Sequence, residues 1–394
     1  MLRWMGRAAV EMIAQSGLGY SFDTLTGDTP DHPYIKTMKQ FQPVLFSLIL
    51  PRQFLPWLTK NTSLGFRRAL LDMTPWPTLH KARDMIDLMH RTSIEILDTK
   101  KRALEEGDEA VERQVAQGKD ILSILLRANM EAKGEDVLPE SELLAHITTL
   151  IFAAMDTTSI AMSRTLNLLA ENQDIQSRLR EELVEARRTH GGDLSYDALG
   201  SLPYLDAVCR ETLRLYPPIS YVWRTCRKDA ILPLSSPIVG VDGREMTEIA
   251  IPENTNVAIA IMAANRNPAL WGPDAAEWKP DRWLSPLPES VTSAHTPGIY
   301  SNLMTFLGGG RSCIGFKFSQ LEMSEYTIST FMSRVHLGIM AEAVLSVMVE
   351  SFVFSLPKEE IVWNMTAIAT PTVKGAKGVM AQMPLKMELV KGQA

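Results

Sequence analysis

The sequence contains little of several features that define whole classes of protein. Only 3 cysteines occur among its 394 residues, and Cys209, Cys226 and Cys313 form no even, closely spaced framework, so a reducing compartment fits better than a disulfide scaffold. Basic residues are not in excess, because 40 Lys and Arg stand against 46 Asp and Glu and the formal net charge is −6. Nucleic acid is therefore not expected as a partner, since binding it requires positive charge to neutralise phosphates.

Long apolar runs are also missing. No segment reaches the roughly 18–20 uninterrupted apolar residues of a membrane span, because Val44–Leu50 is short and the run around Leu150 contains Asp156. The amino terminus lacks the basic-then-apolar pattern of a signal peptide. The glycosylation sequons at Asn61 and Asn364 carry no weight in a reducing compartment. We therefore expect no transmembrane anchor in the chain as written.

Helical spacing of apolar residues dominates the first two thirds of the chain. The longest such pattern starts at Pro139-Glu140 and continues for roughly 30 residues, a rod on the order of 45 Å that must cross a domain core. The segment Phe41–Leu58 is apolar and rich in proline, and it fits either two short helices at a membrane surface or a core segment. The helices predicted from spacing cover residues 2–17, 80–107, 119–132, 139–169, 174–188 and 203–216.

The pattern changes towards strands between residues 219 and 263. Ile238–Val241 is followed by the turn residues Asp242-Gly243, and short β-type runs follow at Ile249–Ile251 and Val257–Ile261. Residues 266–300 predict an irregular but ordered stretch, and a helix and further short strands are expected after Cys313. The sequence thus predicts a mainly α-helical fold with small β-sheets, in a single domain over residues 1–394.

The segment Phe306–Gly315 has the composition of a loop that presents a thiolate to a metal. Its glycines permit a tight turn at little cost in conformational energy. A helix beginning at Cys313 would direct free N–H groups and a positive dipole at the sulfur, lowering the pKa of the thiol, and Arg311 would pair with a carboxylate of a bound group. A buried inert cysteine is the plain alternative, whereas a phosphate loop is disfavoured because no Lys-Ser or Lys-Thr follows the glycines.

This ten-residue segment resembles the F-x-x-G-x-R-x-C-x-G signature of the cytochrome P-450 superfamily. The resemblance implies that haem b is the cofactor, that Cys313 is the axial ligand of its iron, and that Arg311 contacts it. Phe306, Gly309 and Gly315 are the other matching positions around the cofactor. By the same resemblance Arg224 contacts a haem propionate, although it otherwise has the properties of a surface arginine.

Two further segments resemble family motifs in the expected order. Glu211 and Arg214 match E-x-x-R and lie on one helix face at i and i+3. Arg282 matches the arginine of P-x-R-F, with Trp283 in the place of phenylalanine. The resemblance makes Glu211, Arg214 and Arg282 structural supports of the cysteine loop rather than reactants. Losing one partner of such a buried charge cluster costs around 3–5 kcal/mol, so each is expected to be intolerant of change.

The long helix contains Ala153–Thr158, which is similar to the oxygen-activation motif of the family. Cleaving dioxygen requires protons, so an acid and an alcohol are needed beside the reacting centre. The resemblance assigns Thr157 to the positioning of water and dioxygen and Asp156 to proton delivery. Read without the resemblance, Thr157 bonds back to its own i−4 carbonyl and Asp156 is a satisfied core carboxylate. The family usually has glycine where Ala154 stands.

The chain departs from the family in two places. It begins late, so the membrane anchor, the first helices and part of the main sheet are expected to be missing from it. Residues 326–340 extend the helix behind Cys313 beyond the family length, and we interpret them as an insertion. Phe152–Thr158 resembles fungal members.

The resemblance implies a monooxygenase that inserts one atom of dioxygen into a small apolar organic substrate. Its electrons would come from NADPH through NADPH-cytochrome P-450 reductase, and a full-length form would lie at the cytosolic face of the endoplasmic reticulum membrane. The alternative is a truncated, non-catalytic remnant that binds haem without turnover or binds none. A haem-thiolate isomerase or dehydratase is disfavoured, because Asp156-Thr157 is intact.

Overall fold

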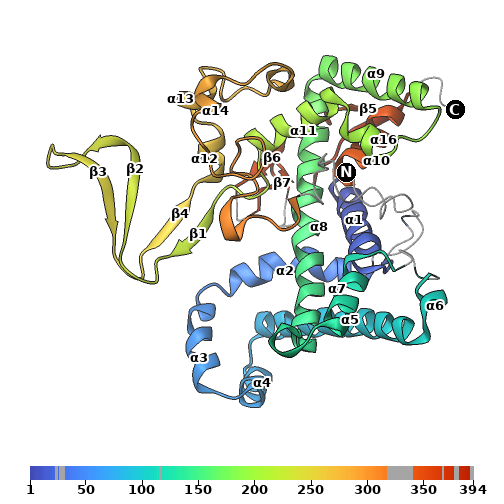
Figure 1. Ribbon diagram of the computed structural model, residues 1–394, viewed down its shortest axis with the longest axis vertical. Helices are drawn as coiled ribbons and strands as arrows, with labels where there is room; N and C mark the ends of the chain where they lie inside the picture. The colour runs from blue at the N-terminus through green and yellow to red at the C-terminus, as the bar shows by residue number, and fades with distance from the viewer. Residues whose placement is uncertain are drawn as a thin grey trace. The chain divides into compact units, whose positions relative to one another are not determined.

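The described part of the chain consists of helices and four two-stranded antiparallel ribbons (Figure 1). The structure is a computed structural model and describes residues 1–22, 25, 32–112, 114, 118–316, 340–365, 368–376 and 381–390. The mainly α-helical fold with small sheets is confirmed. The expected insertion 326–340 lies outside the described residues except for Met340, and the assignment of one domain to residues 1–394 stays a prediction.

Contacts divide the chain into two units, each of which is described by itself. The first comprises residues 1–163, 192–200 and 317–348, and the second comprises residues 164–191, 201–316 and 349–394. Helix α8 (Glu140–Glu171) contributes residues to both units, and so does α16 (Met340–Ser351).

The described residues of the first unit form helices joined by loops, and no strand occurs among them. Its remaining elements are α1 (Leu2–Ile13), the π-helical turn η1 (Ala14–Leu18), α2 (Pro33–Ser47), η2 (Pro51–Phe54), α3 (Leu55–Asn61), α4 (Leu64–Met73), α5 (Pro77–Glu106), α6 (Asp108–Glu112), α7 (Ile121–Glu131), η3 (Gly134–Asp136) and α10 (Tyr196–Gly200). The helices predicted over 2–17, 80–107, 119–132 and 139–169 all form, with ends that differ by a few residues.

Two features of this unit were not predicted from spacing. Helix α2 starts at Pro33, where His32 caps it by accepting a hydrogen bond from the amide of Tyr34 at 3.2 Å, and it continues through Pro43. Helix α4 begins after Ser63, whose hydroxyl caps it by accepting from the amide of Phe66 at 3.3 Å. No residue of α4 is buried, although Phe66, Leu70 and Met73 recur at helical spacing.

The core of the first unit forms around one face of α8. Leu143, Ile147, Ile151 and Met155 recur at helical spacing and are buried against α1, α2, α5 and α7. Away from this apolar cluster, Lys100 of α5 donates at 2.7 Å to Asp120, and both side chains are almost fully buried. Asp120 also caps α7 by accepting from the amide of Ser123 at 2.9 Å, so the carboxylate stabilises a helix start and a buried cation at once.

Helix α8 is also long and apolar enough to cross a membrane by length and composition. Among the described residues, Gly134–Glu171 contains an 18-residue window with a mean hydropathy of 1.4. No such segment was expected from the sequence, because an uninterrupted apolar run was required and Asp156 interrupts this one. The mean hydropathy of an 18-residue window can stay high when a single charged residue is included. Its buried face belongs to the core cluster of the first unit, which accounts for the hydrophobicity of that face without a membrane.

The second unit carries the ribbons. Its helices are α9 (Gln173–His190), α11 (Pro203–Leu215), α12 (Ile261–Asn265), α13 (Pro268–Trp271), η4 (Pro280–Leu284), α14 (Glu289–Thr292) and η5 (Gly309–Arg311), and its strands are β1 (Val222–Thr225), β2 (Ala230–Val239), β3 (Glu245–Ile251), β4 (Asn256–Ile259), β5 (Phe352–Ser355), β6 (Ile361–Asn364), β7 (Thr370–Val373) and β8 (Lys386–Leu389). The pairs are β1–β4, β2–β3, β5–β8 and β6–β7. The β2–β3 hairpin turns at the predicted Asp242-Gly243 and extends outward from β1–β4 (Figure 1).

Candidate functional site

A buried ion pair on α11 is the centre of the site. Pro203 occupies the first turn of this helix, and Glu211 and Arg214 lie one turn apart on its buried face, each with a fully buried side chain. The guanidinium donates from Nε to Oε2 and from Nη2 to Oε1 of Glu211, both at 2.8 Å. This parallel pair of charge-assisted bonds is the strong, geometrically specific form of the interaction.

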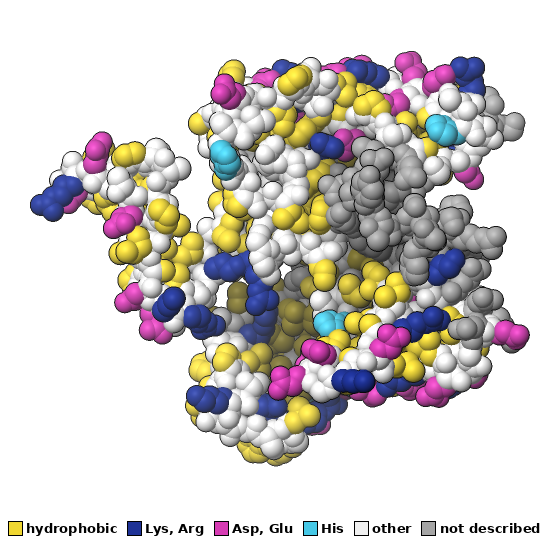
Figure 2. Space-filling model, in the orientation of Figure 1, with side chains coloured by type: hydrophobic (Ala, Val, Ile, Leu, Met, Phe, Trp, Pro, Cys, Tyr) yellow, Lys and Arg dark blue, Asp and Glu magenta, His cyan; other side chains and the backbone are white. Residues whose placement is uncertain are grey.

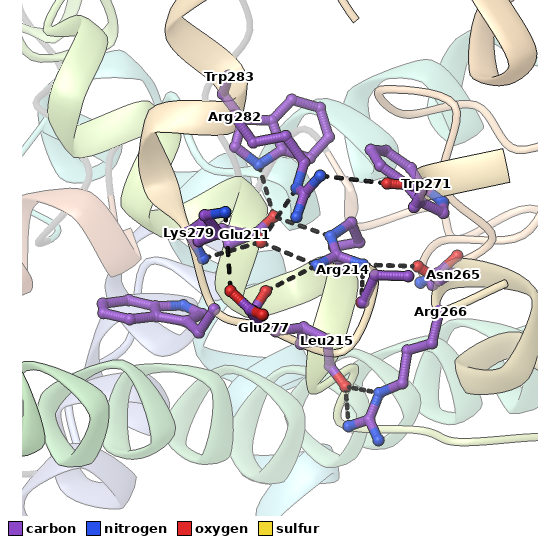
Figure 3. Close-up of polar contacts among 12 residues, drawn as sticks. Glu211, Arg214, Leu215, Asn265, Arg266, Trp271, Glu277, Lys279, Arg282 and Trp283 are labelled. Carbon is purple, nitrogen blue, oxygen red and sulfur yellow. Dashed lines mark hydrogen bonds and ion pairs between the residues drawn. The ribbon is translucent and has the colours of Figure 1, made fainter. Parts of the chain in front are cut away.

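The Glu211 carboxylate accepts three further N–H groups from η4 and the residue before it (Figure 3). The amide of Lys279 donates at 3.0 Å and Nε of Arg282 at 3.4 Å. The indole N–H of Trp283 donates to Oε2 at 3.0 Å, a bond that phenylalanine at this position could not make. The structure thus brings Glu211, Arg214 and Arg282 together; their role in supporting the cysteine loop stays a prediction.

The two arginines bind main-chain oxygens on their other sides. Arg214 donates to the carbonyls of Asn265, Ala275 and Glu277 at 3.1, 2.7 and 3.1 Å. Arg282 donates to the main-chain carbonyl of Asp274 and also to its carboxylate, both at 3.1 Å. Hydrogen bonds from Lys279 and Arg282 lower the pKa of Asp274 to about 2. The Asp274 carboxylate therefore stays charged over the whole physiological range.

Asn265 was not predicted, although it is buried and makes a hydrogen bond from each end of its side-chain amide. Its Oδ1 accepts from the amide of Met304 at 2.7 Å, and its Nδ2 donates to Oγ1 of Thr305 at 2.9 Å. Thr305 in turn donates to the carbonyl of Leu213 in α11 at 2.8 Å. These contacts join the charge cluster to the segment that leads to Cys313.

The cysteine loop is folded tightly, as its glycines predict. Gly309 has φ +68°, and a Cβ added to Gly308 would lie 1.7 Å from the carbonyl oxygen of Pro297, so no side chain fits there. The amide of Cys313 donates to the carbonyl of Phe306 at 2.9 Å and closes the loop. The Phe306 ring packs edge-on against Tyr300 with centroids 5.4 Å apart.

The Cys313 thiol differs from expectation in its pKa. Cys313 lies at the exposed surface of the chain, but protein atoms packed around the sulfur desolvate it and raise the pKa of the thiol above its ordinary value. A hydrogen bond from the amide of Gly315 acts in the opposite direction and is the smaller effect. The expected lowering is therefore wrong for the protein alone. Cys313 itself is not helical, and the helix expected after it lies outside the described residues beyond Phe316.

The donor set around Cys313 fits a metal that brings most of its own ligands. No group of three or more His, Cys, Asp or Glu is placed to hold a metal ion within the part of the chain that the structure describes. A single thiol therefore suits iron held in a macrocycle, which needs only an axial protein ligand. Arg311 is exposed and has no ion-pair partner among the described residues, whereas exposed Arg224 donates to the carbonyl of Trp223 at 2.9 Å.

Asp156 and Thr157 belong to the first unit, whereas the charge cluster around Glu211 and the cysteine loop belong to the second unit. Helix α8 is continuous through Ala154, and the Thr157 hydroxyl donates to the carbonyl of Ala153 at 2.7 Å. This is the i−4 bond that a threonine in the middle of a helix commonly makes. Burial raises the pKa of Asp156 to about 6, and the positive charge of Lys39 acts against that shift.

Comparisons with known proteins agree on one family. The model of the family described as Cytochrome P450 matches residues 1–365. "Cytochrome P450 monooxygenase 91" of Postia placenta is 51% identical over 99% of this chain and 68% of its own length. "Ganoderic acid synthetase CYP5150L8" of Ganoderma lucidum is 46% identical over 94% of this chain and 65% of its own length. The crystal structure of a cytochrome P450 (CYP102L1) shares the fold, with a TM-score of 0.63 and 22% identity over 99% of this chain and 68% of that one.

The raised pKa of Asp156 makes stability depend on pH. Because the folded state binds this proton more tightly than an unfolded chain with a carboxyl pKa near 3.8 does, the benefit is complete below that value and is lost as pH rises through about 6. Asp156→Asn should therefore stabilise the protein by about 1–2 kcal/mol at pH 8, allowing for partial exposure of the group, and by about half as much at pH 5.

Denaturant unfolding of both chains at the two pH values measures this difference. Lys39→Met is a second test, because removing the nearby cation should move the loss of stability to higher pH. An effect of Asp156→Asn that is equal at pH 5 and pH 8 would contradict the assignment.

Proposed function

Because the chain belongs to the cytochrome P450 family, we propose that it is a haem-thiolate monooxygenase that inserts one atom of dioxygen into a small apolar organic substrate. The observation that carries this proposal is the presentation of Cys313 on a closed glycine loop, with the amide of Gly315 directed at its sulfur. Such an amide donor stabilises negative charge on sulfur, which a thiolate ligand of iron requires.

The residues that hold haem b in this proposal all belong to the second unit. Cys313 would supply the sulfur ligand of the iron, Phe306, Gly309 and Gly315 would shape the loop around it, and the guanidinium groups of Arg311 and Arg224 would pair with the carboxylates of the cofactor. Haem, when bound, supplies the activation of dioxygen and the oxidation of the substrate. Electrons come from NADPH through NADPH-cytochrome P-450 reductase.

Asp156 and Thr157 manage protons and water in this proposal. An acid whose pKa is about 6 exchanges its proton near neutral pH, as a proton donor in repeated turnover must do. The proton of the Thr157 hydroxyl is directed at Ala153, so the oxygen presents lone pairs that accept a hydrogen bond from water. Thr157 then orients a water molecule rather than donating its own proton.

We also propose that the protein works at the cytosolic face of the endoplasmic reticulum membrane. Supporting this is the α3–α4 surface, defined here as residues 46–76. Apolar side chains that are 64–76% exposed include Leu50, Phe54, Trp57 and Leu64. Figure 2 shows hydrophobic and basic side chains side by side over α3 and α4. Exposed aromatic side chains flanked by lysine and arginine are typical of helices that lie in a membrane interface.

The haem-thiolate proposal predicts a spectrum. After reconstitution with haem, the reduced carbon-monoxide complex of this chain should show a red-shifted Soret band that is lost in Cys313→Ala. Cys226→Ala, which removes the other accessible thiol, is the matched control and should keep the band. Retention of the band in Cys313→Ala, or failure of the unaltered chain to take up haem, would contradict the proposal.

The membrane proposal predicts a loss of vesicle binding. In flotation with vesicles of phosphatidylcholine and phosphatidylserine, Phe54→Ser combined with Trp57→Ser should reduce the bound fraction about tenfold, because two apolar side chains no longer enter the bilayer. Val239→Ser combined with Val241→Ser removes apolar side chains of higher fractional exposure from the β2–β3 hairpin and should have little effect. Equal losses in both variants would show that exposed hydrophobicity in general, and not the α3–α4 surface, is responsible.

A further inference from the structure

The carboxyl end of α11 cannot supply backbone amide donors to two of its last carbonyl groups. Pro217 and Pro218 follow the helix, and the carbonyls of Leu213 and Arg214 would normally accept from the amides of these two residues at i+4. Proline has no N–H, so the carbonyl of Leu213 needs a donor from elsewhere in the chain. A buried carbonyl without a partner costs about 1–3 kcal/mol.

Thr305 supplies that donor. Its hydroxyl donates to the carbonyl of Leu213 at 2.8 Å and accepts from Nδ2 of Asn265 at 2.9 Å. The other end of the Asn265 amide accepts from the amide of Met304 at 2.7 Å. Two successive residues of the incoming segment are therefore fixed to α11 and to the end of α12.

The segment held in this way leads directly to Cys313. Phe306 follows Thr305, and its carbonyl accepts from the amide of Cys313 at 2.9 Å. Along this route only two hydrogen bonds separate the backbone of α11 from the backbone of Cys313. On the other side, Arg214 donates to the main-chain carbonyl of Asn265 at 3.1 Å, so the charge cluster is connected to the same route.

We propose that Thr305, oriented by the Asn265 amide, is the positioning residue that fixes the Cys313 loop relative to α11. The carbonyl of Leu213 accepts the hydroxyl proton of Thr305 and so fixes where the hydroxyl lies. The Asn265 amide donates to the hydroxyl oxygen, which leaves the hydroxyl proton directed at Leu213. Thr305 touches neither the cofactor nor substrate in this account. The consequence for the thiolate rests on the proposed function, whereas the consequence for the backbone of the loop does not.

The test compares Thr305→Val with Thr305→Ser. Valine keeps the shape of threonine but leaves Leu213 and Asn265 without their partner, whereas serine keeps the hydroxyl. Ser123→Ala is the control for general destabilisation, because it removes a buried hydroxyl that donates to Asp120 at 2.8 Å in the first unit. Each chain is examined without cofactor by amide hydrogen exchange and, after haem loading, by the carbon-monoxide spectrum.

We expect Thr305→Val to accelerate exchange of the Met304 and Cys313 amides roughly tenfold, because local opening no longer breaks the two bonds of the hydroxyl. The same variant should lose a large part of its red-shifted Soret band in favour of a band at shorter wavelength, while Thr305→Ser and Ser123→Ala keep it. Unchanged exchange at both amides, or an equal acceleration in Ser123→Ala, would overturn the positioning role.

The two readouts separate this inference from the proposed function. If the unaltered chain lacks the red-shifted band but Thr305→Val still accelerates exchange at Met304 and Cys313, the positioning role stands and the haem-thiolate assignment fails. If the unaltered chain shows the band and Thr305→Val keeps both the band and slow exchange, the haem-thiolate assignment stands and the positioning role fails.

Discussion

The buried ion pair between Glu211 and Arg214 is the interaction on which the second unit depends. Removing two charges from water costs several kcal/mol per ion, and their attraction compensates only when the remaining lone pairs and protons are also satisfied. The surrounding chain meets that condition. The carboxylate accepts five N–H groups, and the guanidinium binds three main-chain carbonyls between Asn265 and Glu277 as well as the carboxylate. These bonds fix the backbone conformation of residues 265–277, a segment with little regular secondary structure.

Proline extends the influence of this pair to the cysteine loop. Because Pro217 has no N–H group, the carbonyl of Leu213 takes its partner from Thr305. The carbonyl of Leu215, at the end of the helix, likewise accepts from a distant residue, Arg266, at 2.6 Å. The last carbonyl groups of a helix have no donors within the helix, and here that need ties the segment leading to Cys313 to α11. The residues that carry the thiol are attached at the point where the helix leaves its own hydrogen bonds incomplete.

Much of the fold could be predicted from the sequence because it follows local rules. The helices α5, α8 and α11 have strong apolar periodicity and proline at or just before their starts, and the hairpin at Asp242-Gly243 has explicit turn chemistry. Helix α4 was not among the predicted helices, and none of its residues is buried in the structure. Membership of the family could be predicted from the complete signature around Cys313.

The details of the site were less predictable because they depend on contacts between distant segments. Asn265 and Thr305 match no motif, and only the orphaned carbonyl of Leu213 could have indicated that a donor was needed. The sign of the pKa shift at Cys313 was wrong because a dipole argument considered the helix alone, while burial of the sulfur is the larger effect. For Thr157, the plain rule for a threonine in the middle of a helix describes the hydroxyl correctly.

The charge cluster around Glu211 and the hydrogen bonds between Thr305 and Asn265 are energetically coupled in this account. A double-mutant cycle tests it most directly, with Trp283→Phe removing one N–H from Glu211 and Thr305→Val removing the link. The two side chains share no hydrogen-bond partner, so independent sites would give additive losses in the free energy of unfolding. We predict a coupling of at least about 0.5 kcal/mol, transmitted through Arg214 and Asn265. Strict additivity within experimental error would contradict the account.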